Sequence, residues 1–214
     1  MRTTAFARPT TEDLHDHLVG LLFGFDDHLS GVILAAYGDL ARTLGGISAH
    51  PNSASLKKDA VALLRASLPK GVSSASDREK FDDWHQATCI SLREIYLRGQ
   101  FDRFSIGHSQ KWVNMAVKYL VLLEDRAVPG AADLLPVAHM PLDSIILGVL
   151  KRDYDLSTNS CEPWSKIPDY EIYMDLQNRI RSKFHPSYLL SAELQLWRPE
   201  TDASHSGGRQ EPAR

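Results

Sequence analysis

Apolar residues recur along most of the chain at intervals of three and four positions, which is the period of an α-helix that buries one face. The longest such segment spans residues 105 to 126. Its apolar positions are Trp112, Val113, Ala116, Val117, Tyr119, Leu120, Val121 and Leu123. They cover most of the circumference of the helix, and this pattern predicts a helix in the interior of the fold.

The same period predicts six more helices. They span residues 10–25, 30–44, 52–68, 76–97, 141–150 and 169–184. Residues 188–197 fit either a helix or a strand, and no hairpin signal occurs anywhere. We therefore predict an all-α protein, an irregular bundle of about seven to eight helices around a central apolar helix. Residues 10–197 are expected to form one domain, preceded by a polar leader at 1–9 and followed by a disordered tail at 198–214.

Local signals set the expected ends of several segments. Thr10 and Asp13 resemble a capping box, and apolar residues follow on one face at Leu14, Leu18, Leu21, Leu22 and Phe25. The helix that begins near residue 52 is expected to stop before Pro69, leaving residues 70–75 as a loop. Residues 153–168 lack any period and are expected to form a long ordered loop anchored by Trp164.

Composition narrows the function classes. A hydrophobic content of 43% is ordinary for a globular core, and a formal charge of -3 provides no overall positive field for nucleic acid. The two cysteines, Cys89 and Cys161, are far apart and are expected to be free thiols of a reducing compartment. The amino terminus has no secretion signal, and no apolar run reaches the roughly 20 residues of a membrane span. We expect a cytoplasmic protein without a membrane partner.

The apolar segment also carries a narrow polar stripe, formed by Gln110, Lys111, Asn114 and Lys118. Spacings of three and four residues bring these side chains together on a helix. Asp143, Trp164 and Lys166 are candidates to join them in space. Such a wall of amides and amines could bind a phosphate or carboxylate, with a tryptophan as a stacking face. Alternatively, the stripe faces water or hydrogen-bonds to a neighbouring loop.

A second candidate site precedes the apolar segment, where Arg103 and His108 stand in RFSIGH. This spacing resembles the Arg-x4-6-His signature of HEPN ribonucleases, which are small α-helical domains. The resemblance covers six residues and implies metal-independent RNA cleavage. A cation would stabilise charge on the phosphate, while an imidazole titrating near neutrality would move the proton.

Other chemistry has little support in the sequence. The full set of glutamates and histidines of a di-metal bundle is missing, so no metal site and no cofactor are expected. No nucleophile elbow or glycine-rich phosphate loop is present. Two functions remain: a binding module for a protein partner or a small anionic ligand, or a HEPN-like endoribonuclease acting on RNA. Whether the protein is an enzyme stays open, as does a homo-oligomer built on the central helix.

Overall fold

The computed structural model describes residues 10–185 and 188–206. This part of the chain contains eight α-helices and five short 3-10 turns, and no strand. The α-helices are α1 (Thr11–Phe23), α2 (His28–Ala41), α3 (Ser53–Ser73), α4 (Arg78–Arg98), α5 (Ile106–Leu123), α6 (Ser144–Tyr154), α7 (Tyr170–Lys183) and α8 (Leu189–Ser206). The predicted all-α helical bundle is thus confirmed for the described residues.

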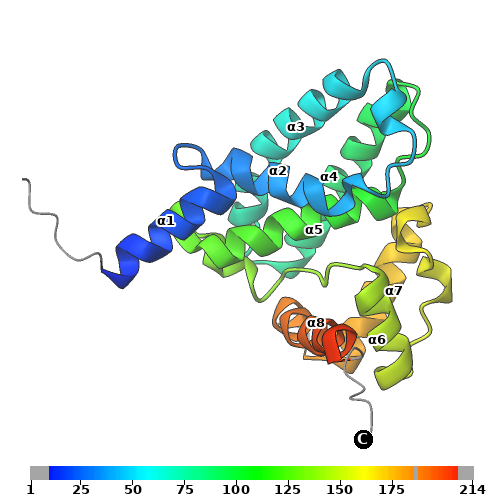
Figure 1. Cartoon of the computed structure of the whole chain (residues 1–214). Coiled ribbons are helices and arrows are strands. Elements are labelled where there is room, and N and C mark those ends of the chain that lie inside the picture. Colours follow the sequence, from blue (N-terminus) through cyan, green and yellow to red (C-terminus); the bar gives the residue numbers. More distant parts are fainter. Residues whose placement is uncertain (1–9, 186–187, 207–214) are drawn as a thin grey trace, which may run out of the picture.

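Helix α5 runs between α2 and α4, and α3 packs along α4 (Figure 1). Fourteen residues of α5 are buried, from Ile106 to Leu123. The last three helices, α6, α7 and α8, gather beside the amino-terminal end of α5, while α1 projects from the opposite side of the molecule (Figure 1). Two 3-10 turns, Glu124–Arg126 and Ala131–Leu134, lead from α5 into the segment 135–143, which begins with a turn and then has no regular secondary structure.

Side-chain caps define the beginnings of these helices. Ser105 caps α5 and Asp169 caps α7, each by accepting a hydrogen bond from a backbone N–H three residues later. Helix α4 is capped by Asp77, one residue beyond the serine at which the sequence pattern begins. Asp143 caps α6, so this helix starts at Ser144 and not at Pro141.

Helix α3 continues through Pro69 to Ser73, so the expectation that it stops before the proline is wrong. Leu68 and Gly71 are buried on either side of the proline. The ring of Trp84 lies against Gly71, and its Nε1 donates to the carbonyl of Ser67 at 3.0 Å. Packing on α4 therefore outweighs the one backbone hydrogen bond that a proline removes.

The segment between α6 and α7 is ordered by two 3-10 turns, Asn159–Cys161 and Trp164–Lys166. Trp164 is only 8% exposed, and both cysteines are free and buried. The carboxyl-terminal element is helical, and α8 continues to Ser206, beyond residue 197 where the folded domain was predicted to end. The predicted leader at 1–9 and the last residues of the predicted tail, 207–214, lie outside the described residues.

Candidate functional site

The amino-terminal end of α5 is fixed by a capping box and by a close backbone contact. The Ser105 N–H donates to His108 Nδ1 at 3.1 Å, and Ser105 Oγ donates to the carbonyl of Ser165 at 2.7 Å. Gly107 N–H donates to the carbonyl of Ile167 at 3.2 Å. A side chain at Gly107 would lie 1.8 Å from the carbonyl oxygen of Trp164, so only glycine fits there. The turn that holds Trp164 is thereby attached to α5.

The polar stripe of α5 divides into two sets that face different surroundings. Adjacent helix positions differ by about 100°, so Gln110 and Asn114 lie to one side of Lys111 and Lys118. Gln110 and Asn114 are buried, and their amides bind groups of the protein interior. Lys111 and Lys118 face α6 and α8, where each forms an ion pair.

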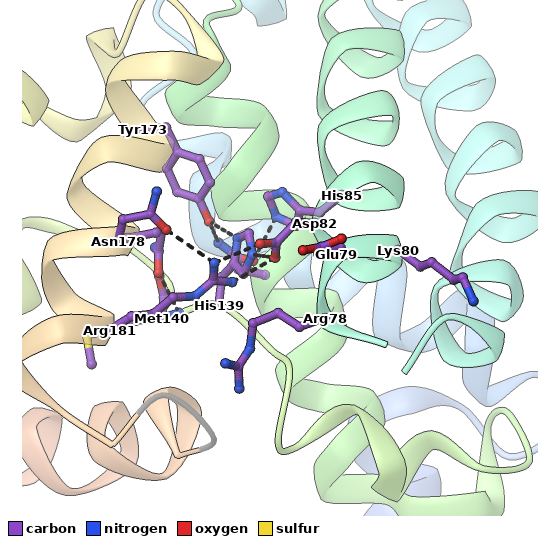
Figure 2. A network of polar contacts seen from close by, with 12 residues as sticks. Arg78, Glu79, Lys80, Asp82, His85, His139, Met140, Tyr173, Asn178 and Arg181 are labelled. Atoms are coloured by element: carbon purple, nitrogen blue, oxygen red, sulfur yellow. Dashed lines mark hydrogen bonds and ion pairs between the residues drawn. The ribbon is translucent and has the colours of Figure 1, made fainter. Parts of the chain in front are cut away.

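The buried amides of α5 belong to a hydrogen-bonded chain that we call the interior network. Its members are Asp82, His85, Gln110, Asn114, His139, Tyr170, Tyr173 and Arg181. Figure 2 shows His139 between Asp82 and Tyr173, with Arg181 against the carboxylate. The network ties α4, α5 and α7 to the segment before α6.

The chemistry of the partners sets the direction of each hydrogen bond. Asp82 accepts two hydrogen bonds of 2.7 Å from Arg181, and it also accepts from His139 Nε2 at 2.7 Å. Burial lowers the pKa of His139, so the ring is neutral and its Nδ1 accepts from the Tyr173 hydroxyl at 2.8 Å. The Tyr173 oxygen in turn accepts from Asn114 Nδ2 at 2.9 Å.

His85 completes the chain at its inner end. Its Nε2 donates to Asn114 Oδ1 at 2.9 Å, and its Nδ1 accepts from the Tyr170 hydroxyl at 2.8 Å. Burial, together with the neighbouring ring of His139, holds the pKa of His85 well below its usual value. Burial alone would raise the pKa of Asp82, but His139 and Arg181 keep it well below its ordinary range. Among the described residues, Arg181 Nε is the network atom that is buried without a hydrogen-bond partner. The other polar groups pair with one another, so the network mainly stabilises the packing of the helices.

Two buried glutamines bind the backbone of the segment before α6. Gln110 donates to the carbonyl of Leu142 at 3.0 Å and accepts from its N–H at 3.3 Å. Gln177 of α7 makes the same pair of bonds with Met140, at 2.7 and 3.2 Å. Each glutamine amide thus supplies both hydrogen-bond partners of one buried backbone residue, in a segment that has no regular secondary structure.

The outer set of the stripe lines an open cleft of about 450 Å³, which we call the lysine cleft. Its lining residues are Asp39, Arg42, Thr43, Lys111, Met115, Lys118, Tyr119, Asp143, Ser144, Ile145, Trp164 and Trp197. Four of the predicted ligand-binding residues thus lie together, namely Lys111, Lys118, Asp143 and Trp164.

Ion pairs position both lysines of the cleft. Lys111 Nζ lies 2.8 Å from Asp143 Oδ2, and the other oxygen of that carboxylate caps α6. Lys118 Nζ contacts both oxygens of Glu193 at 2.8 and 2.9 Å. The lysine side chains are only 6% and 12% exposed. Burial raises the pKa of Glu193, and the Lys118 ammonium opposes that shift.

Arg42 is the cation of the cleft that stands apart from these pairs. It lies at the carboxyl-terminal end of α2 and is exposed, and its side chain makes no hydrogen bond or ion pair with the rest of the described chain. Trp164 and the partly exposed Trp197 add aromatic walls. The cleft therefore offers one unpaired guanidinium beside two held ammonium groups and two indole rings.

The structure separates the other predicted ligand-binding residues from the cleft. Gln110 and Asn114 face the interior network, because one step along a helix turns a side chain to another surface. Lys166 is exposed on the turn after Trp164 and is absent from the cleft lining. Sequence patterns did not identify Arg42, Glu193 or Trp197, since their approach to α5 depends on how α2 and α8 pack.

The two candidate catalytic residues have different local roles. Arg103 is exposed and donates to the carbonyl of Gly45 at 3.1 Å. His108 is buried in the capping box, and burial lowers its pKa to about 4 against a small opposing effect of the Thr43 backbone. No hydrogen bond joins the two side chains in the described part of the chain. Ribonuclease activity stays a prediction.

His108 has one further feature. Because its Nδ1 accepts from Ser105, the imidazole proton lies on Nε2. That nitrogen is buried without a hydrogen-bond partner among the described residues. The ring lies 5.8 Å from that of Trp164, so the histidine sits behind one wall of the lysine cleft.

Helix length and hydropathy were also compared with what a bilayer requires. Within residues 10–185 and 188–206, no single helix is long and apolar enough to cross a membrane. Taken together, α1 and α2 reach the required hydropathy, but they bend by 56° at their junction.

Comparison with protein-family models gives no match, and comparisons with curated proteins and with solved structures give none either.

Proposed function

We propose that the protein is a cytoplasmic binding module that recognises a small anion, bearing phosphate or carboxylate, in the lysine cleft. The observation that carries this proposal is the unpaired guanidinium of Arg42 beside Lys111, Lys118 and two tryptophans in one concavity. Arginine binds carboxylate and phosphate through paired hydrogen bonds, which makes Arg42 the primary anion contact. The buried free cysteines fit a reducing compartment.

The lysines have a different part in this proposal. Both are already neutralised by carboxylates, so they supply a preformed polar floor and add little net charge. An ammonium has three donors, and an ion pair with one carboxylate leaves donors for a ligand. Trp164, Trp197 and Met115 supply apolar surface. A ligand with an anionic group at one end and a flat ring at the other matches both parts of the cleft.

Titration calorimetry tests the proposal with three probes: inorganic phosphate, adenosine 5′-monophosphate and benzoate. The parent protein is expected to bind at least one probe, and more tightly when a ring is present. Arg42→Ala should weaken that binding about tenfold, because a charged hydrogen bond is lost from an exposed site without harm to the core.

Two control variants make the result specific. Arg98→Ala removes an exposed arginine of α4 that pairs with Glu94. Lys166→Ala removes a lysine that was predicted to bind the ligand but does not line the cleft. Both should bind as the parent does. The proposal is wrong if no probe binds the parent, or if Arg42→Ala binds as tightly as the two controls.

A further inference from the structure

Helix α1 carries an apolar face that the rest of the described chain does not cover. Five large side chains are 52–65% exposed: Leu14, Leu18, Leu21, Leu22 and Phe25. We call them the α1 stripe. The sequence pattern predicted an amphipathic helix here, but the helix packs through its other face, where Val19 and Gly20 are buried. Figure 1 shows α1 at the edge of the molecule, reaching away from the other helices.

The orientation of α1 is fixed by contacts opposite the stripe. Asp16 accepts from Arg126 Nε at 3.1 Å, which ties α1 to the turn after α5. Gly31 of α2 comes so close to the carbonyl of Phe23 that a side chain there would lie 1.5 Å from the oxygen. These contacts hold α1 by one face, and the opposite face, with the leucines, is therefore exposed.

Phe25 is also exposed, but it lies past the end of the helix. Gly24 ends α1 with a φ of 86°, a conformation that favours glycine, and the chain then turns back. The Phe25 ring returns to Gly20, where a side chain would lie 2.2 Å from a ring atom. It also lies 5.5 Å from the ring of His17. Phe25 therefore folds back against the side of α1 that carries His17 and Gly20, beside the leucines of the stripe.

The spacing of the stripe identifies its partner as a helix. Within the helix, Leu14, Leu18 and Leu21 follow one another at steps of four and three residues, the heptad spacing of a coiled-coil seam. The residues that flank this seam are His15, His17 and Leu22. The acids of α1 lie elsewhere, so two copies of the helix can meet without carboxylates facing each other.

The charge of α1 favours a second copy of the protein, and not a lipid surface, as the partner of the stripe. Helix α1 contains no lysine or arginine, and it carries Glu12, Asp13 and Asp16. Interfacial membrane helices are rich in cations on their polar face, and an acidic helix is repelled by anionic lipid. The α1 helix of a second copy offers the same apolar seam without this repulsion.

We propose that the protein forms a dimer in which the α1 stripe of one copy packs against the α1 stripe of another. The stripe offers roughly 500 Å² of apolar surface, which is at the upper end for a monomer's largest patch. Two stripes together approach the lower limit of a specific interface, roughly 1,000 Å². A reversible dimer is therefore expected. Helix α5 is not available for the predicted homo-oligomer contact, since α2 and α4 of the same chain cover it.

Sedimentation velocity from micromolar to submillimolar protein tests the dimer. The parent should move from a 23.9 kDa species towards twice that mass as its concentration rises. The double variant Leu18→Gln, Leu21→Gln should raise the dissociation constant by at least about tenfold, because both residues lie in the seam. Leu97→Gln changes a partly exposed leucine of α4 and should dimerise as the parent does.

A cross-link provides a second readout. Leu18 lies near the middle of the stripe, so Leu18→Cys should form a disulfide between two chains on mild oxidation. Cys89 and Cys161 are buried, and Leu97→Cys should give no such product. The proposal fails if the parent is monomeric at every concentration or if the double variant dimerises unchanged. It also fails if the stripe carries the parent onto neutral phosphatidylcholine vesicles without forming a dimer.

Discussion

At the scale of the residue, Asn114 shows how a polar group inside an apolar helix is used. It is 1% exposed, and its amide donates to Gln110 and Tyr173 while accepting from His85. Three of the four bonds available to an amide are therefore made in the interior. The residue joins α4, α5 and α7, because its three partners lie on these helices.

Asn114→Ala should lower the free energy of unfolding by about 3 kcal/mol, since it leaves His85, Gln110 and Tyr173 short of partners in a buried site. Urea unfolding at neutral pH measures the loss. Asn52→Ala is the matched control: Asn52 precedes α3, is exposed and makes no side-chain cap bond, so the change should stay within about 0.5 kcal/mol. Equal stability of the two variants would show that the network does not hold the helices together.

Neighbouring residues also mark the limit of prediction at this scale. The grouping of Lys111, Lys118, Asp143 and Trp164 follows from chemical type and helical spacing, and the structure brings the four together. Gln110 and Asn114 were assigned to the same wall, although they differ from Lys111 only by a rotation about the helix axis. Helix α7 covers the side of the stripe that carries Asn114. The position of α7 cannot be predicted from a local sequence pattern.

At the scale of the element, the turn Trp164–Lys166 depends on one glycine of α5. Gly107 lets the turn approach the helix closely enough for the carbonyl of Ile167 to accept its N–H. The same turn receives the Ser105 hydroxyl on the carbonyl of Ser165. One wall of the lysine cleft is therefore set by backbone contacts and not by side-chain packing alone.

Gly107→Ala should destabilise the protein by about 2 kcal/mol, because the new methyl group meets a backbone oxygen that cannot move alone. Gly148→Ala in α6 is the matched control, since a side chain there meets nothing within 4 Å. It should stabilise the helix by about 0.5–1 kcal/mol. Thermal unfolding compares both with the parent. A Gly107→Ala protein as stable as Gly148→Ala would contradict the close contact.

The positions of most helices could be predicted from the sequence. The exact ends of the helices, and which of their faces the chain covers, could not. Periodicity located α1 to α7, and the predicted start of the central segment at residue 105 coincides with the cap of α5. Helix α8 was not identified, because residues 188–197 fit either a helix or a strand. The prediction that α3 stops before Pro69 was wrong, because packing of Leu68 in the core outweighs the helix-breaking effect of the proline. The α1 stripe shows the other limit: an amphipathic pattern predicts that a face is covered, but not that the cover belongs to the same chain.

At the scale of the whole molecule, three imidazoles lie inside a core that stabilises their neutral forms. Burial lowers the pKa of His85, His108 and His139, and that of His108 falls to about 4. In the unfolded chain each would titrate near 6.5. The unfolded state therefore binds more protons than the folded state below this pH. Asp82 acts in the same direction at still lower pH, because its pKa is also depressed.

Stability should consequently fall as the solution is acidified from pH 7 to pH 5. The loss is about 2 kcal/mol for each histidine that stays neutral in the folded state, because protonation favours only the unfolded chain in this window. Urea titrations at pH 7, 6 and 5 measure it. His108→Gln removes one of the three groups and should reduce the difference between pH 7 and pH 5 by about 2 kcal/mol, whatever its effect at neutral pH. A parent equally stable at pH 7 and pH 5, or a variant with the same pH dependence as the parent, would show that the buried imidazoles accept protons in the folded state.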